Sequence, residues 1–336
     1  MNIALPALNK PVLWSVAAMG AVVLGLTWPE QTYATLRFVL VNFWDVAPTI
    51  AIGIVLSAWV AASGAGAVSA KWFAGRPVST IVVASAIGTV TPVCGVTVLP
   101  LMTGFLAAGV PLAPIMAFWL SSPITDPAMF AVTWAVLGPA FAIGKTIAAF
   151  ALGLFAGAGT AALTGTSAVE HPLRSSRSAE YCSCLPARFS FQIWREPARM
   201  QVFRGELLAM TRLIGLCLGL AFSAEHLLRD LLPPDLLATY VGKESAYAIP
   251  LAVMVGVPMY LDGYAALPLV RGLLDAGMSP GAAMAFLVSG GAVSIWGVMA
   301  VVAVLRPATI ALFVVLATVG SLAIGYGFDA AWALLP

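Results

Sequence analysis

The chain has 336 residues, of which 61% are hydrophobic and only 9% are charged, and its net charge is +2. Soluble globular domains carry about 25% charged residues, so most of this chain does not face water. The small net charge argues against a nucleic-acid-binding protein, since no basic run with interleaved aromatic residues occurs. We therefore expect an all-α polytopic membrane protein in a lipid bilayer.

Apolar segments follow one another along the chain in two sets. The first, Val12 to Trp28, is about as long as one spanning helix requires, and we interpret it as an uncleaved span. The first set continues at 36–62, 79–108, 112–137 and 141–163, and the second comprises 206–222, 246–276, 280–305 and 308–328. The predicted organisation is an N-terminal span (1–35), a first repeat (36–163), a polar basic loop placed in the cytoplasm (164–205) and a second repeat (206–336).

The two sets resemble each other in sequence. A shift of 168 residues lays "GVTVLPLMTGFLAAGVPLAPIMAFWLS" (95–121) on "GYAALPLVRGLLDAGMSPGAAMAFLVS" (263–289), with 12 of 27 positions identical. Paired glycines and prolines coincide, which similar composition alone does not explain. Internal repeats of this kind are typical of transporters, whose binding sites lie near the membrane midplane where the halves meet.

The distribution of basic residues predicts how the halves are oriented. If 79–108 and 246–276 are re-entrant hairpins, each half has three spans and the halves are inverted. Ten lysines and arginines then face the cytoplasm and four face outward, whereas full spans give seven on each side. The positive-inside rule favours hairpins and inverted repeats.

Prolines and glycines interrupt the repeated segments at matching places. Proline removes a backbone donor, glycine permits an irregular backbone, and such breaks inside a membrane occur where they are buried in protein or line a cavity. A helix that restarts there points its N–H groups into the cavity. The predicted helix breaks are Pro92, Gly95 and Pro100 in the first half, and Pro258, Gly263 and Pro268 in the second.

Several polar side chains fall within the apolar segments. The stretch "SSPITDP" contributes Ser121, Ser122, Thr125 and Asp126, and its counterpart in the second half contributes Ser289. Asp126 and Asp262 are intramembrane carboxylates, which are costly unless paired or hydrated and are therefore candidates for substrate binding or proton coupling. Helix packing remains an alternative role for the small hydroxyl residues. We expect Lys145 to lie near a span end and to extend toward the interface, and do not place it in the site.

Cysteine chemistry offers one further candidate. Cys94 lies in the first break, and a thiolate there would bind a soft ion, although a lone buried cysteine also behaves as a small apolar residue. Its repeat counterpart is Asp262, which argues against a redox enzyme that uses a cysteine from each half. Cys182 and Cys184 form a C-x-C pair, a weak candidate for metal binding, in the polar loop. No Walker motif occurs, and no cofactor is expected.

These motifs resemble those of a known family. The stretches "TPVCGVTVLPLMTGFLAAGVPLAPIMAFWLSSPIT" and "GVPMYLDGYAALPLVRGLLDAGMSPGAAMAFLVSG" are similar to the two copies found in the predicted-permease family of YraQ-like proteins and ArsP-type organoarsenical efflux permeases. The resemblance covers about residues 36–330 without the central loop. Where that family commonly has "CSCG", this chain reads "PVCG": Cys94 matches the second cysteine and Pro92 replaces the first.

The resemblance implies a secondary permease, not an enzyme, in the bacterial inner membrane. It implies efflux of a small solute, organoarsenical-like or otherwise thiol-reactive, and a role in arsenic resistance. Alternating access, proton coupling and a site at the broken helices would complete this function. A channel, a membrane thiol-redox protein and a membrane subunit of a multi-component transporter remain alternatives, and a homo-oligomer also stays open.

Overall fold

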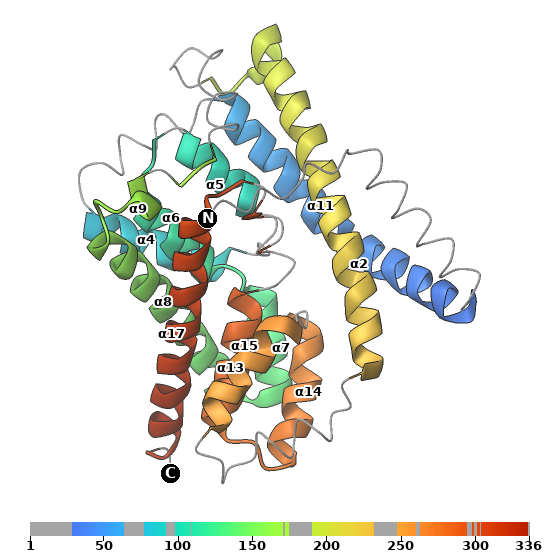
Figure 1. The fold of residues 1–336 in the computed structure, drawn as a ribbon, viewed down its shortest axis with the longest axis vertical. Coiled ribbons are helices and arrows are strands. Elements are labelled where there is room, and N and C mark those ends of the chain that lie inside the picture. Colours follow the sequence, from blue (N-terminus) through green and yellow to red (C-terminus); the bar gives the residue numbers. More distant parts are fainter. Residues whose placement is uncertain are drawn as a thin grey trace, which may run out of the picture.

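In the computed structural model, the regular secondary structure of the described residues is helical (Figure 1). This bears out the all-α expectation. The structure describes residues 29–63, 77–91, 98–107, 109–170, 172–174, 190–231, 247–259, 263–293, 298, 301, 302 and 304–334. The predicted first span, Val12 to Trp28, lies outside them.

The helices of the first half are α2 (Pro29–Ser63), α4 (Pro77–Val90), α5 (Val98–Ala107), α6 (Leu112–Ser121), α7 (Pro127–Leu137) and α8 (Pro139–Ala162). The helices of the second half are α11 (Pro197–Leu231), α13 (Ala248–Met259), α14 (Gly263–Asp275), α15 (Pro280–Ala292) and α17 (Pro307–Trp332). A short helix, α9 (Ser167–Glu170), and a 3-10 turn, η1 (Ile193–Arg195), lie between the halves. By length and composition, α8 and α17 qualify as membrane-crossing helices.

The starts of two helix pairs are separated by the same number of residues as the sequence repeat. Pro197 of α11 lies 168 residues after Pro29 of α2, and both helices are 35 residues long. Pro307 of α17 likewise lies 168 residues after Pro139 of α8. Proline suits the first position of a helix because its missing N–H would have no partner there. The helices α2 and α11 therefore begin earlier than the predicted repeat boundaries at residues 36 and 206.

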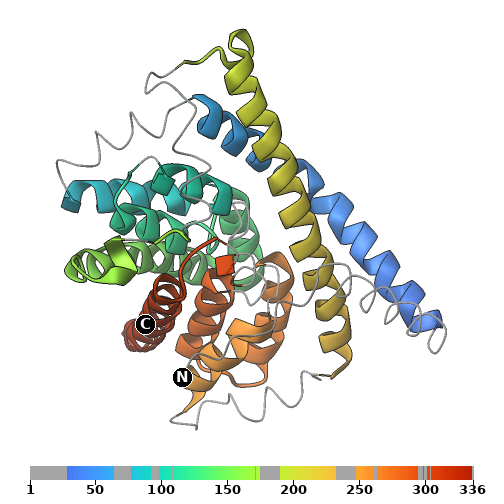
Figure 2. The same ribbon diagram turned by 45° about the horizontal axis from the view of Figure 1, so that its top comes forward.

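The long helices run in opposite directions. In Figure 1, α8 leads toward the end of the molecule where α17 begins, and α2 and α11 cross it in opposite senses. Figure 2 shows α2 and α11 side by side along one edge of the molecule, away from the bundle formed by the other helices. In that bundle α8 packs on α6 and α17, and α15 packs on α13 and α17.

Equivalent turns connect equivalent helices in the two halves. Gly109 has φ +85° and Gly277 has φ +98°, a left-handed conformation that favours glycine. The amide of Gly109 donates to Leu106 O at 3.0 Å, and that of Gly277 donates to Leu274 O at 3.0 Å. In each case the next amide donates to the carbonyl five residues back, which is the hydrogen-bond pattern of a Schellman motif. These turns end α5 and α14 and let the chain reverse into α6 and α15.

Three of the long apolar segments are interrupted helices. Segment 79–108 forms α4 and α5, segment 112–137 forms α6 and α7, and segment 246–276 forms α13 and α14. Two expected break residues are placed differently. Pro100 is the third residue of α5, where a missing N–H costs nothing, and Pro268 lies inside α14. Pro258 lies in the last turn of α13 and Gly263 begins α14, so these two do flank an interruption.

Candidate functional site

The helices α6 and α15 approach each other at their C-terminal ends. A Cβ atom on Gly291, near the end of α15, would lie 3.2 Å from the carbonyl oxygen of Pro123 and 3.4 Å from the Cα atom of Ile124, just after α6. The two backbones therefore meet at a distance that only glycine allows without displacement. This contact joins the first and second halves of the chain.

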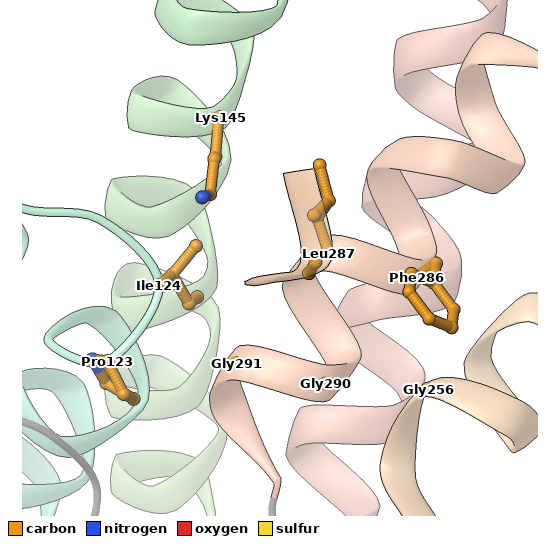
Figure 3. A pocket seen from close by; sticks show the side chains of 9 residues that line it. Pro123, Ile124, Lys145, Gly256, Phe286, Leu287, Gly290 and Gly291 are labelled. Carbon is orange, nitrogen blue, oxygen red and sulfur yellow. The ribbon is translucent and has the colours of Figure 1, made fainter. Parts of the chain in front are cut away.

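A pocket of about 330 Å³ of empty space, part of it open to solvent, lies beside this contact. Its lining comes from both halves: Pro123, Ile124 and Lys145 from the first, and Gly256, Ala266, Phe286, Leu287, Gly290 and Gly291 from the second. Figure 3 shows Lys145 reaching from α8 into the space beside α15, with its nitrogen directed toward Ile124. The lining is otherwise apolar or glycine.

Lys145 is buried, with only 2% of its surface exposed. The expectation that it extends to the membrane interface is therefore wrong. Lys145 is the seventh residue of α8, about 9 Å from the helix start at 1.5 Å per residue, and the ends of α6 and α15 cover it there. Carbonyl groups at helix C-termini carry partial negative charge, which favours an ammonium group between them. A charge buried at this depth is costly and points to function by default.

The counterpart of this pocket in the other half is filled. Shifting Lys145 and Leu287 by 168 residues gives Phe313 and Trp119, whose rings stack with centroids 3.9 Å apart at an interplanar angle of 17°. Trp119 and Phe313 are both 2% exposed. Equivalent positions thus form an aromatic stack on one side and a cation-lined pocket on the other.

Ser121 and Ser289 pack helices together. The hydroxyl of Ser121 donates to Ala117 O at 2.9 Å, and that of Ser289 donates to Phe286 O at 3.3 Å. A Cβ on Gly88 of α4 would come within 2.1 Å of Ser121 Oγ, and one on Gly256 of α13 within 2.5 Å of Ser289 Oγ. Each serine therefore faces a glycine of the neighbouring helix, and neither lines the pocket.

Asp126 begins helix α7. Its Oδ1 atom accepts hydrogen bonds from the amides of Ala128 at 2.8 Å and Met129 at 2.9 Å. This is an N-cap, in which the carboxylate also complements the positive helix end. Thr125, just before it, is 4% exposed. The geometry gives Asp126 a structural role that does not depend on substrate.

Ser122 combines burial with an unsatisfied hydroxyl. It is 2% exposed, and its Oγ has no hydrogen-bond partner among the residues that the structure describes. It directly precedes Pro123, which lines the pocket. A buried hydroxyl without a partner costs free energy, so Ser122 adds a polar group beside the pocket that a ligand or water would satisfy.

The other predicted residues lie outside the described part of the chain. These are Pro92, Cys94, Gly95, Cys182, Cys184 and Asp262. Within the described part, no three His, Cys, Asp or Glu side chains gather as they would around a metal ion. Among the predicted residues that are described, Ser122 and Thr125 flank the pocket segment Pro123–Ile124 in sequence.

Lys145 is the residue that sequence reasoning missed. Its signal was present in the repeat, because the 168-residue shift places this lysine opposite Phe313 within two otherwise apolar helices. A charged residue in one copy and an aromatic residue in the other marks a position where the halves have diverged. Distance from the helix end was a poorer guide, since neighbouring helices decide whether a side chain reaches water.

Comparison with known proteins gives a match over most of the chain. A family model described as "predicted permease" (ArsP_1) matches residues 33–329. UPF0718 protein MJ0584 of Methanocaldococcus jannaschii is 27% identical over 135 residues, which is 40% of this chain. The match spans 37% of the length of that curated relative. No solved structure matches the chain.

Proposed function

Because the chain belongs to the ArsP_1 family of predicted permeases, we propose that it is a secondary permease of the bacterial inner membrane that exports a small solute by alternating access. The observation that carries this proposal is the pocket between the halves, at the C-terminal ends of α6 and α15. Transporter sites typically lie where two repeats meet and where helices are interrupted. A transmembrane protein of this family with a buried cation at that place is suited to binding a solute midway.

The proposal includes two inverted repeats. Support comes from the equal spacing of α2 and α11 and of α8 and α17, from the matching turns at Gly109 and Gly277, and from the opposite directions of α8 and α17 in Figure 1. Inverted halves that exchange conformations would expose one site to each side of the membrane in turn. The proton motive force is the proposed energy source, because the sequence carries no Walker motif.

Cys94 and Asp262 keep their proposed roles as a soft contact and a coupling carboxylate. Both belong to the interruptions that precede α5 and α14, and Ala266 of α14 lines the pocket. The proposed cargo is an organoarsenical-like or other thiol-reactive compound, as the family resemblance implies. Asp126 enters this proposal as a helix cap, although a coupling role is tested below.

Accumulation of trivalent methylarsenic tests the proposed cargo. A host without arsenic exporters would express the wild type, Cys94→Ser or an empty vector, with arsenite as the control compound. Lower accumulation with the wild type, lost in Cys94→Ser, is the expected result. Equal accumulation in all three strains would overturn the organoarsenical cargo. The permease function is tested separately by the access of reagents to the pocket from both sides.

A further inference from the structure

We propose that the pocket beside Lys145 binds the anionic group of a small organic acid, with Lys145 as its counter-charge. The inference deepens the proposed permease function and rests on it only for the role of the site in transport. Binding itself is a separate property of the folded protein.

Charge is the first argument. Lys145 is 2% exposed and is the one charged residue among those known to line the pocket. Helix ends contribute partial negative charge, but a buried ammonium remains favourable to a full opposite charge brought close to it. An anionic group would gain a charge-assisted hydrogen bond in an environment with little competing water.

The two-fold pattern supplies the second argument. The scaffold accepts an aromatic pair, Trp119 and Phe313, at the positions equivalent to Leu287 and Lys145. A buried lysine is therefore not needed to build this kind of helix contact. Replacing buried charges by apolar residues is often neutral or stabilising, so a lysine here carries a cost that a ligand would justify.

Lining residues and space define the rest of the ligand. Ile124, Leu287 and Phe286 present apolar surface, while Gly290 and Gly291 keep the backbone accessible. Ser122, next to the pocket segment, has a buried hydroxyl without a partner among the described residues. The fitting ligand is a molecule of a few heavy atoms with one anionic head and a short apolar tail. A carboxylate, a phosphonate and an arsonate share this chemistry.

The test measures thermal unfolding of the full-length protein purified in detergent. Butyrate, methylphosphonate and methylarsonate are the anionic probes, and butyramide is the neutral match for butyrate. At least one anion should raise the unfolding midpoint of the wild type by about 2 °C or more above the buffer control, while butyramide should not. A ligand that binds only the folded state shifts the midpoint in this way.

Four variants assign any shift to the pocket. Lys145→Met should abolish it, and Lys145→Arg should retain part of it. The double variant Lys145→Phe/Leu287→Trp copies the pair found in the other half, so it should fold and fill the pocket. Arg271→Gln removes an exposed cation from α14, whose side chain pairs with Asp275 at 3.2 Å, and should leave the shift unchanged.

The inference is overturned if none of the three anions exceeds butyramide, or if Lys145→Met responds as the wild type does. Should the double variant fail to unfold cooperatively, the comparison between Lys145→Met and Arg271→Gln still decides. Lys145-dependent binding without two-sided access to the pocket would leave the binding inference standing and remove the permease function. Two-sided access without anion binding would do the reverse.

Discussion

The two sides of the central helix contact use equivalent positions for opposite purposes. On one side, Trp119 and Phe313 stack and fill the space between α6 and α17. On the other, Leu287 and Lys145 leave a pocket between α15 and α8. The comparison teaches that the backbone arrangement does not by itself make the site. Two substitutions between the copies, one of size and one of charge, distinguish packing from binding.

This comparison also separates two kinds of small residue. Gly88 and Gly256 hold helices together in both halves by facing Ser121 and Ser289. Gly291 instead lets α15 approach the segment after α6, and its counterpart at that position is Pro123. Features found in both halves therefore serve the fold, whereas features found in one half mark the site.

The filled side should depend most strongly on its aromatic stack. Trp119→Leu makes this side resemble the open one and removes a buried ring, so the free energy of unfolding should fall by about 2–4 kcal/mol. Trp119→Phe, which keeps a ring against Phe313, should lose less. Chemical denaturation in mixed micelles measures both. Equal stability of Trp119→Leu and the wild type would contradict the packing role.

The glycine contacts should respond unequally to a methyl group. A Cβ at Gly88 would lie 2.8 Å from the carbonyl oxygen of Phe118, whereas one at Gly256 would lie 3.0 Å from that of Phe286. We expect Gly88→Ala to lower the free energy of unfolding by about 1–3 kcal/mol and Gly256→Ala by less.

Removal of the facing serine sharpens this expectation. Ser289→Ala should rescue most of the loss in Gly256→Ala, because the hydroxyl is the closest atom there. Ser121→Ala should rescue Gly88→Ala only in part, because the backbone of Phe118 remains too close. The four double-mutant stabilities test the pattern, and full rescue in the first half would contradict it.

The smallest effect is expected at Asp126. Asp126→Ala should cost about 1 kcal/mol of stability through loss of the cap on α7, while Asp126→Asn should cost only a few tenths because asparagine caps nearly as well. Unfolding and solute efflux are measured on both variants. Normal stability but lost efflux in Asp126→Asn would show that the negative charge is needed for coupling, beyond the cap.

Much of the fold could be predicted from particular sequence features. Composition gave the all-helical class, and the prolines and glycines indicated interruptions that occur between α4 and α5 and between α13 and α14. The exact breaks were harder, because Pro100 falls in the first turn of α5, where proline is tolerated, and Pro268 is accommodated within α14.

The site was less predictable because its character depends on contacts between distant segments. Ser121 and Ser289 look polar in the sequence, but their hydroxyls bond to their own helices. Asp126 looks like an intramembrane charge, but it caps a helix. Lys145 looks peripheral by its distance from the helix start, yet neighbouring helix ends bury it.

Access to the pocket from each side of the membrane tests the central claim most directly. Leu287→Cys would be labelled with a membrane-impermeant thiol reagent in right-side-out and inside-out vesicles, with the wild type measuring the native cysteines. Ala149→Cys, at a buried position of α8 that does not line the pocket, serves as the matched control. The account predicts labelling of Leu287→Cys from both sides and none of Ala149→Cys. Labelling from one side only, or from neither, would contradict a permease whose site lies between the halves.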